Sequence, residues 1–326
     1  MASSSPLPKT LDSTRARELL TESVKSIGTV LRGADDASKL ILACVISRGH
    51  VLLEDVPGVG KTTLARTVAR VLGCSFGRIQ FTSDMLPSDV LGVQILDPNS
   101  GQLSFRRGPI FSQVILADEI NRASPKTQSA MLEAMADRQV SIDDRTHELD
   151  SPFIVLATQN PVEHHGAYPL PESQLDRFMI CLSLGYPPAE DELALLANPR
   201  GPEATLDALA PVFSVQEVHA TQLLVDRVRL AEPVAQYLLT VVAGTRTHPD
   251  VLLGVSPRGS LAFAGLARAW AFLNGRDFVT PDDIKALVRP AMAHRLTVGG
   301  ASSMSGARTT AEAILDEILG QVPVPR

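Results

Sequence analysis

The feature that most constrains the fold is a glycine-rich segment, EDVPGVGKTT (54–63), which lies between an apolar run and a helical one. The run VLLED (51–55) has the composition of a buried strand, and the residues from about Lys61 to Leu72 have that of a helix that Gly73 can end. Gly58 and Gly60 allow a tight turn whose N–H groups converge at the start of that helix. The segment therefore predicts a phosphate-binding loop.

The predicted loop consists of Pro57, Gly58, Val59, Gly60, Lys61, Thr62 and Thr63. We expect Lys61 to reach the β and γ phosphates of a nucleotide and the Thr62 hydroxyl to ligate Mg²⁺. The general pattern G-x-x-x-x-G-K-[ST] asks for glycine at position 55, where this chain has Asp55. The alternative is a glycine-rich turn that caps an ordinary helix.

Apolar runs recur along the first half of the chain. Helical stretches separate five of them: VLLED (51–55), GRIQF (77–81), VILAD (114–118), FIVLAT (153–158) and MICLSL (179–184). Strands that alternate with helices indicate a parallel sheet, and runs that are apolar throughout are typical of strands covered on both faces. After Pro187 and Pro188 the strand pattern disappears, and residues 189–322 have the pattern of helices.

These patterns divide the chain into three parts. Residues 1–11 are rich in Ser and Pro, and they precede a helix that Asp12 or Ser13 can cap and that extends to about residue 31, so we expect a mobile tail. Residues 12–188 are predicted to form an α/β nucleotide-binding core. Residues 189–326 are predicted to form a helical domain.

Polar side chains follow the third and fourth apolar runs, at the sheet edge that faces the ligand crevice in parallel sheets. Asp118 can bind Mg²⁺ through its water shell, and Glu119 can orient and deprotonate the attacking water. Asn160 can hydrogen-bond the γ phosphate and that water. The structural alternatives are a solvated acidic pair or helix cap at 118–119 and an Asn-Pro turn at 160–161.

Together with these motifs, four longer segments resemble the MoxR family of AAA+ ATPases, over about residues 12–322. The segments are RIQFTSDMLPSDVLG (78–92), DEINRASPKTQSAMLEAM (118–135), ATQNPVEHHGAYPLPESQLDRF (157–178) and GVSPRGSLAF (254–263). The resemblance implies an AAA+ P-loop NTPase core, with a parallel sheet of order 5-1-4-3-2 flanked by helices, and a C-terminal all-α lid domain. ATP would lie between core and lid, with Asn160 between Lys61 and the two carboxylates.

The resemblance also implies Mg²⁺-dependent hydrolysis of ATP to ADP and phosphate in a homo-oligomeric ring, commonly a hexamer. Arg177 matches the arginine that such proteins donate to a neighbouring subunit's nucleotide, and Arg258 matches the sensor arginine of the lid. The simpler interpretation of Arg177 is an ion pair within the chain, with Asp176 or a nearby carboxylate, and that of Arg258 is an ordinary surface arginine near a helix start. Residues 30–33 are the segment implied to contact adenine.

Two predicted hairpins, at 92–109 with a DPNSG turn and at 139–150, are typical of the MoxR-like branch. In the family such inserts face the pore or a partner, which makes Phe105, Arg106 and Arg107 candidate contact residues. A solvated loop with one packed Phe is the alternative. His164 and His165 are adjacent in an extended segment, so a shared metal is not expected.

As a function, the resemblance implies a chaperone-like remodelling or maturation factor for a protein client, with proteins that contain a von Willebrand factor A domain as candidate partners. The alternatives are a nucleic-acid-associated AAA+ motor and a nucleotide-dependent scaffold that does not hydrolyse ATP. A net charge of −6 and 4% aromatic residues weigh against nucleic-acid binding, which is not expected. The presence of Glu119, Asn160 and Arg177 weighs against the scaffold.

The remaining features indicate the compartment. Cys44, Cys74 and Cys181 are widely spaced, so we expect reduced thiols and no metal site. The N-terminus lacks the apolar stretch of a signal peptide, and the longest apolar run, residues 40–46, is far shorter than the ~20 residues that span a bilayer. A cytoplasmic protein without membrane insertion is expected.

Overall fold

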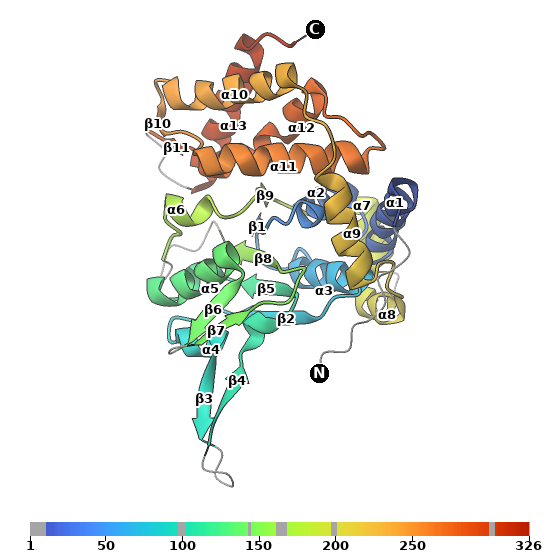
Figure 1. Ribbon diagram of the computed structural model, residues 1–326, viewed down its shortest axis with the longest axis vertical. Helices are drawn as coiled ribbons and strands as arrows, with labels where there is room; N and C mark the ends of the chain where they lie inside the picture. Colours follow the sequence, from blue (N-terminus) through green and yellow to red (C-terminus); the bar gives the residue numbers. More distant parts are fainter. Residues whose placement is uncertain are drawn as a thin grey trace.

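The computed structural model describes residues 11–96, 102–142, 145–160, 168–196, 201–299 and 304–325. A five-stranded parallel sheet lies at the centre of the core (Figure 1). Its strands are β1 (Val51–Glu54), β2 (Phe76–Gln80), β5 (Val114–Asp118), β8 (Ile154–Gln159) and β9 (Ile180–Leu182), in the order β2-β5-β8-β1-β9. If these five strands are numbered 1 to 5 in the order of the sequence, their order across the sheet, read from the β9 edge, is 5-1-4-3-2. The expected fold and strand order are therefore confirmed.

Alternate residues of a strand point to opposite sides of the sheet, and in the inner strands the residues on both sides are buried. In β1, Val51 and Leu53 belong to one buried cluster, while Leu52 belongs to a second cluster on the other face. In β5, Leu116 and Ala117 divide between the two clusters in the same way. A strand that is covered on both sides has no solvent face, which explains why most of the runs in the sequence are almost entirely apolar; β2 differs, since its Arg78 and Gln80 are exposed.

Helices of the core cover each face. Of the core helices, α1 (Ser13–Val30), α2 (Asp35–Ile46) and α3 (Lys61–Val71) contribute to the first cluster, which continues into the helices of the C-terminal part, and α4 (Pro87–Leu91) and α5 (Pro125–Asp137) contribute to the second. The short elements η1 (Pro109–Phe111), η2 (Ile120–Arg122) and α6 (Glu172–Leu175) connect strands and helices. As predicted, Asp12 caps α1, because its carboxylate accepts a hydrogen bond of 2.7 Å from the Arg15 N–H.

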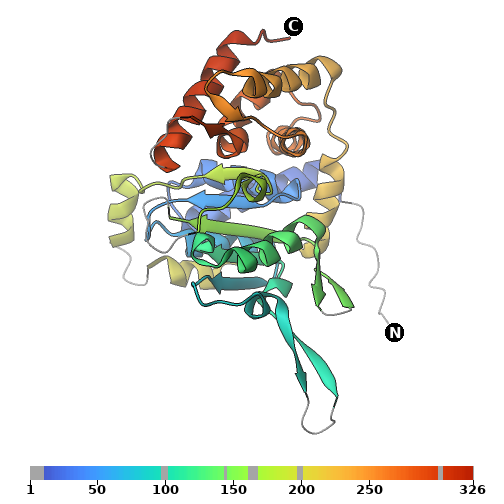
Figure 2. The same cartoon turned by 90° about the vertical axis from the view of Figure 1, so that its left-hand side faces the viewer.

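Seven helices follow the sheet in the described part of the chain. They are α7 (Ala189–Leu196), α8 (Gly201–Ala208), α9 (Val215–Val225), α10 (Glu232–Thr247), α11 (Pro257–Leu273), α12 (Pro281–Met292) and α13 (Met304–Gln321). Helices α10 to α13 pack on one another in a layer beyond the β9 edge of the sheet, at the top of Figures 1 and 2, whereas α8 lies against α3 and α9 against α2. Helix α12 continues directly into the short helical turn η3 (Ala293–Arg295).

The expectation of an entirely helical C-terminal part requires a correction. Strands β10 (Val251–Leu253) and β11 (Thr297–Val298) form a small antiparallel pair beside α10. Segments of three and two residues are too short to show a strand period, so the sequence pattern could not reveal them.

Both predicted hairpins are present. The first pairs β3 (Gly92–Leu96) with β4 (Leu103–Arg107) and projects from the body of the molecule in Figure 2, and the second pairs β6 (Gln139–Ile142) with β7 (Arg145–Glu148). The DPNSG turn, the predicted tail up to residue 10, and His164 with His165 lie outside the described residues.

Phe105, one candidate contact residue of the first hairpin, packs against two other aromatic rings of the chain. The Phe105 ring stacks on His147 of the second hairpin, with 4.4 Å between ring centroids, and meets Phe111 edge-on at 5.7 Å. Phe105 therefore joins the bases of the two hairpins, as in the packed-Phe alternative, while Arg106 and Arg107 are exposed.

His50 is buried in the core just before β1. Its Nδ1 accepts the Val155 N–H at 3.1 Å, so Nε2 carries the proton and donates to the Met135 carbonyl oxygen at 3.2 Å. Burial lowers the pKa of this imidazole from 6.5 to about 4, which is assisted by the nearby charge of Arg138. The folded protein therefore holds His50 neutral.

This burial predicts a loss of stability in mild acid. The unfolded chain takes up a proton below pH 6.5 and the folded chain only near pH 4, so the stabilisation is complete above pH 6.5 and falls as the pH drops toward 4. Between pH 7.5 and 5 we expect the free energy of unfolding to fall by ~2 kcal/mol more in the wild type than in His50→Gln. Urea titrations measure this, with His219→Gln, an exposed histidine, as control. Equal pH dependence in all three proteins would contradict the assignment.

The cysteines agree with the expected free thiols: Cys44 and Cys181 are buried, and Cys74 is partly buried. Burial raises the pKa of the Cys74 thiol to about 12 and that of Cys44 further still. Among the described helices, none is both long and apolar enough to span a bilayer.

Candidate active site

The predicted phosphate loop connects β1 to α3. Gly58 (φ 90°) and Gly60 (φ 92°) both have left-handed backbone conformations, which are strained for other residues, and Gly60 is the N-cap of α3. The Lys61 ammonium donates hydrogen bonds to the carbonyl oxygens of Asp55 at 2.7 Å and Val56 at 3.3 Å. Burial lowers the pKa of Lys61, against the opposing effect of the carboxylates of Asp55, Asp118 and Glu119. The loop thus places the Lys61 ammonium group beside the carboxyl end of β1.

The two carboxylates stand where β5 ends. Asp118 is its last residue, and Glu119 has a left-handed backbone (φ 57°, ψ 48°) that is uncommon outside glycine. Thr158 stabilises this turn, since its hydroxyl oxygen accepts the Glu119 N–H at 2.8 Å and its hydroxyl donates to Asp118 Oδ1 at 2.8 Å. A strained conformation of this kind costs ~1–3 kcal/mol and is typical of functional sites, where the surroundings hold it.

Two residues of β2 and one of η2 contact the carboxylates. Arg78 Nη2 lies 2.7 Å from Asp118 Oδ2, Gln80 Nε2 donates to Glu119 Oε2 at 3.0 Å, and Arg122 Nη1 lies 3.1 Å from the same oxygen. The parallel register, in which Gln80 lies opposite Asp118, brings these side chains together. Arg78, Gln80 and Arg122 had no predicted role, although two polar residues at alternate positions of a strand could have indicated that one side of the strand faces a polar site.

The phosphate loop, the two carboxylates and the two side chains of β2 line one cavity of about 370 Å³. From the loop it is lined by Pro57, Gly58, Gly60, Lys61 and Thr62. From the other strands it is lined by Arg78, Gln80, Asp118, Glu119, Thr158 and Asn160. Because β8 lies between β1 and β5, Asn160 at its end is placed between the loop and the carboxylates.

A second cavity, of about 310 Å³, adjoins the first, since Gly58 and Gly60 line both. Val59 and Thr63 face this second space rather than the first. Its remaining walls are residues 30–34, residues 184–187 after β9, and Pro202. The segment expected to contact adenine therefore lies directly beside the loop.

Arg177 does not line either cavity. Its guanidinium Nη1 donates to the Leu132 carbonyl oxygen of α5. The alternative pairing with Asp176 is wrong, because Asp176 pairs with the buried Arg295, whose Nε lies 3.0 Å from Asp176 Oδ1. Asp176 Oδ2 also accepts the Ser256 hydroxyl at 2.8 Å, which connects this segment to the start of α11.

Arg258 lies in the first turn of α11. Ser256 caps this helix by accepting the Gly259 N–H at 2.9 Å, and Pro257 is the first helical residue, as predicted. The Arg258 side chain is exposed and makes no hydrogen bond or ion pair with another described residue. The structure therefore separates Arg177 and Arg258 from the residues around the phosphate loop.

The residues of the first cavity fit a magnesium ion bound together with phosphates. Within the described residues no cluster of three or more His, Cys, Asp or Glu side chains could hold a metal alone. The cavity offers instead one hydroxyl, Thr62, and one carboxylate, Asp118, near a loop built for phosphate. Mg²⁺ retains several waters and takes further oxygens from substrate phosphates, so a small set of protein ligands suits it.

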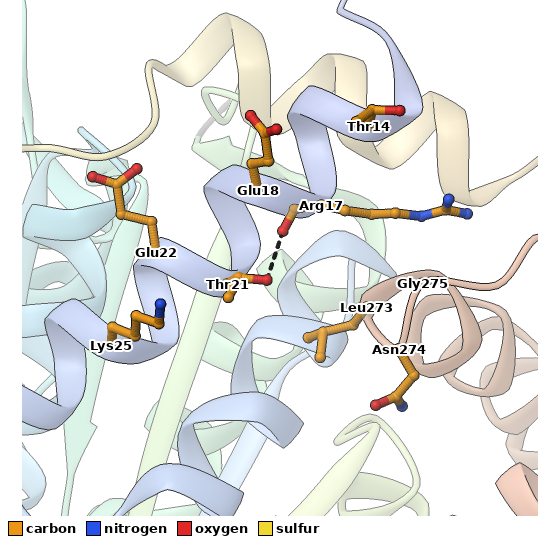
Figure 3. A pocket seen from close by; sticks show the side chains of 9 residues that line it. All are labelled: Thr14, Arg17, Glu18, Thr21, Glu22, Lys25, Leu273, Asn274 and Gly275. Carbon is orange, nitrogen blue, oxygen red and sulfur yellow. Dashed lines mark hydrogen bonds between the residues drawn. The ribbon is translucent and has the colours of Figure 1, made fainter.

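A larger space, of about 720 Å³, lies elsewhere, between α1 and the end of α11 (Figure 3). Charged side chains of α1, including Arg17, Glu18, Glu22 and Lys25, surround it with Leu273 to Gly275. None of the predicted site residues lines it.

Comparison with protein families gives two matches. Residues 50–180 match the ATPase family associated with various cellular activities (AAA), and residues 243–318 match the AAA lid domain. The first range contains the phosphate loop, both carboxylates, Asn160 and Arg177, and the second contains Arg258.

Individual relatives match over nearly the whole chain. Protein YeaC of Bacillus subtilis (strain 168) is 47% identical over 94% of this chain and 95% of its own length. Chaperone MoxR1 of Mycobacterium tuberculosis is 37% identical (94% and 80% covered), and protein MoxR of Paracoccus denitrificans is 32% identical (92% and 94% covered).

Two solved structures are also similar. The crystal structure of a candidate ATPase from Cytophaga hutchinsonii superimposes with a TM-score of 0.86 and 35% identity, covering 96% of this chain and 97% of that one. A full-length MCM homologue from Methanopyrus kandleri has a TM-score of 0.58 at 20% identity, covering 91% of this chain and 64% of that one. The second likeness is one of fold alone.

Proposed function

The chain belongs to the MoxR family of AAA+ ATPases, and on this basis we propose that it hydrolyses ATP to ADP and phosphate with Mg²⁺. The observation that carries the proposal is the cavity in which a phosphate loop, Lys61, Asp118 and Glu119 meet. ATP would place its triphosphate there and its base in the adjoining cavity beside residues 30–34.

Each group around the cavity has a chemical task in this reaction. The loop amides and the Lys61 ammonium bind the phosphate oxygens, and the positive end of the α3 dipole adds to their attraction. Thr62 and Asp118 would hold Mg²⁺, which supplies neutralisation of the phosphate charge when it is bound. Asn160 hydrogen-bonds the γ phosphate and orients the attacking water.

Glu119 is the proposed general base. Its carboxylate now accepts from Gln80 and Arg122 through the same oxygen, Oε2, so Oε1 remains the oxygen for a water proton. The left-handed backbone at Glu119, held by Thr158, fixes the direction in which the side chain leaves the strand. The base is therefore positioned before substrate binds.

We further propose that hydrolysis requires a homo-oligomeric ring, with a hexamer as the expected form. Phosphoryl transfer spreads charge over the γ oxygens, and an arginine from a neighbouring subunit can stabilise that charge. Arg177 lies outside its own chain's cavity, which is consistent with action at the next subunit. Arg258, exposed at the start of α11, would contact the phosphates from the lid.

The proposed role of this activity is chaperone-like remodelling or maturation of a client protein. Its support is the relative named chaperone MoxR1. A client with a von Willebrand factor A domain is one candidate. The MCM homologue shares only the fold, and the acidic net charge of −6 disfavours a nucleic-acid motor. A scaffold without hydrolysis would leave Glu119, Asn160 and Arg177 without a task.

Substitution of Glu119 by Gln tests the proposal. We expect phosphate release to fall by at least ~100-fold, since a positioned general base contributes ~10²–10⁴-fold, while ATP affinity is retained. Glu133→Gln, at an exposed position of α5, is the matched control and should behave as wild type. No phosphate release by the wild type at any protein concentration would instead favour the scaffold.

The same variant tests the client. In the presence of ATP, Glu119→Gln should keep a client complex from turning over, so a pulldown should retain partners that the wild type releases. Recovery of a protein with a von Willebrand factor A domain would support the proposed partner class. Salt-dependent binding of single-stranded DNA at micromolar protein would favour the nucleic-acid motor.

A further inference from the structure

Asp55 stands where the general phosphate-loop pattern has glycine, and the structure shows what its side chain does. The residue is 5% exposed and follows β1 directly. Its Oδ1 accepts the Ser183 hydroxyl at 2.9 Å and the Gly185 N–H at 3.2 Å, and its Oδ2 accepts the Leu184 N–H. The carboxylate therefore binds one short segment that is far away in sequence.

That segment leaves β9 and forms a wall of the second cavity. Leu184, Gly185 and the following Tyr186 and Pro187 all line that space. Gly185 has a left-handed backbone (φ 67°), so the chain turns sharply where the two N–H groups meet the carboxylate. A glycine at position 55 would leave both N–H groups and the Ser183 hydroxyl without this acceptor.

The opposite wall of the cavity packs against Pro188, the residue that follows this segment. A Cβ built on Gly33 would lie 2.9 Å from Pro188 Cδ, so residues 30–34 and the chain after β9 are packed without room to spare. A Cβ on Gly60 of the phosphate loop would lie 3.4 Å from Leu31 Cδ2. Both walls of the second cavity are therefore fixed relative to the phosphate loop. Packing holds residues 30–34 in place, and the Asp55 carboxylate holds the segment after β9.

We propose that Asp55 is a positioning residue that holds the segment 183–187 beside the phosphate loop and thereby sets the affinity for the nucleoside part of ATP. The inference rests on the proposed nucleotide binding and makes it more specific. Asp55 itself does not line the phosphate cavity, and the atom through which it meets Lys61 is its main-chain carbonyl oxygen, which any residue supplies. The carboxylate acts on the Lys61 ammonium only through its charge, so the hydrogen bonds that hold this ammonium in place do not depend on the Asp55 side chain.

The test is Asp55→Gly, which restores the general pattern. Binding of ATP and of inorganic tripolyphosphate, both with Mg²⁺, is measured by calorimetry on the full chain. Because hydrogen bonds to a charged group are lost from one wall only, we expect ATP to bind at least ~10-fold more weakly and tripolyphosphate to change less than ~3-fold. Unchanged or tighter binding of ATP by the Asp55→Gly variant would overturn the proposal. An equal loss of affinity for ATP and tripolyphosphate would also overturn it.

Two further variants keep the test decisive. Ser183→Ala removes one of the three hydrogen bonds at an exposed position, so it should weaken ATP by ~3-fold without affecting tripolyphosphate, even if Asp55→Gly does not fold. Asp89→Gly is the control. It removes a carboxylate that lines neither cavity and accepts the Leu86 N–H at a distance of 2.8 Å, and it should leave both affinities unchanged. Wild type that binds neither ligand would refute nucleotide binding itself, a result distinct from failure of the Asp55 inference.

Discussion

Lys61→Ala is expected to bind ATP at least ~100-fold more weakly than the wild type and to show no measurable turnover. Among the described residues that line the phosphate cavity, Lys61 is the one lysine. The hydrogen bonds from its ammonium group to charged phosphate oxygens are worth ~1.5–3 kcal/mol each. In the structure the same Nζ donates to two loop carbonyl oxygens, which water can replace, so folding should be little affected.

Calorimetric titration with ATP and a phosphate-release assay measure these effects. Lys126→Ala, at an exposed position in the first turn of α5, removes an equivalent charge away from the cavity and should match the wild type. An unchanged ATP affinity in Lys61→Ala would show that the loop is a glycine-rich helix cap and not a phosphate site.

Arg177→Ala is expected to lower the turnover rate by ~10³-fold or more and to leave ATP affinity nearly unchanged. The reason is that the guanidinium stabilises charge that develops only in the transition state. It does so in the cavity of a neighbouring subunit, because Arg177 does not line the cavity of its own chain. Arg177→Lys should recover little, because an ammonium lacks the planar fork that contacts two oxygens.

Loss of the bond from Arg177 to the Leu132 carbonyl oxygen is a separate, structural effect. Arg268→Ala removes a comparable bond, from Arg268 Nε to the Val228 carbonyl oxygen at 3.2 Å, and serves as control in the turnover assay and in thermal unfolding. A drop in turnover of equal size in both variants would indicate that Arg177 is merely structural.

The parts of this molecule that follow from local composition were predictable. Strands β1, β5, β8 and β9 are buried over most or all of their length, which leaves a continuous apolar signature at each of them, whereas β2 buries Ile79 alone. Strong capping residues marked the starts of α1 and α11, where Asp12 and Ser256 accept N–H groups as expected. The strand order itself followed from the family resemblance, because parallel strands separated by helices do not reveal their neighbours in sequence.

Helix α2 shows where the pattern fails. Residues 40–46 are an unbroken apolar run because α1 and α11 both pack on this helix, and a helix without an exposed face lacks the period that identifies it. The strands β10 and β11 are missed for the opposite reason, since they are too short to show any period.

The site was predicted only where residues belong to contiguous motifs. Arg78 and Gln80 reach Asp118 and Glu119 across a strand pairing that connects residues about 40 positions apart, which single-sequence reasoning does not show. Asp55 was recognised as a departure from the pattern, but its partners, Ser183 to Gly185, are 128 to 130 positions away. Such contacts depend on the tertiary fold and become visible only with it.

The central claim is that one subunit binds the triphosphate and a neighbour supplies the arginine that completes hydrolysis. Mixing Lys61→Ala with Arg177→Ala tests it most directly, once size analysis shows that mixed assemblies form. At some interfaces a Lys61→Ala subunit then offers Arg177 to an Arg177→Ala subunit with an intact loop, so phosphate release should rise from near zero to at most about a quarter of the wild-type rate. If mixed assemblies form and release no more phosphate than either variant alone, the claim is contradicted.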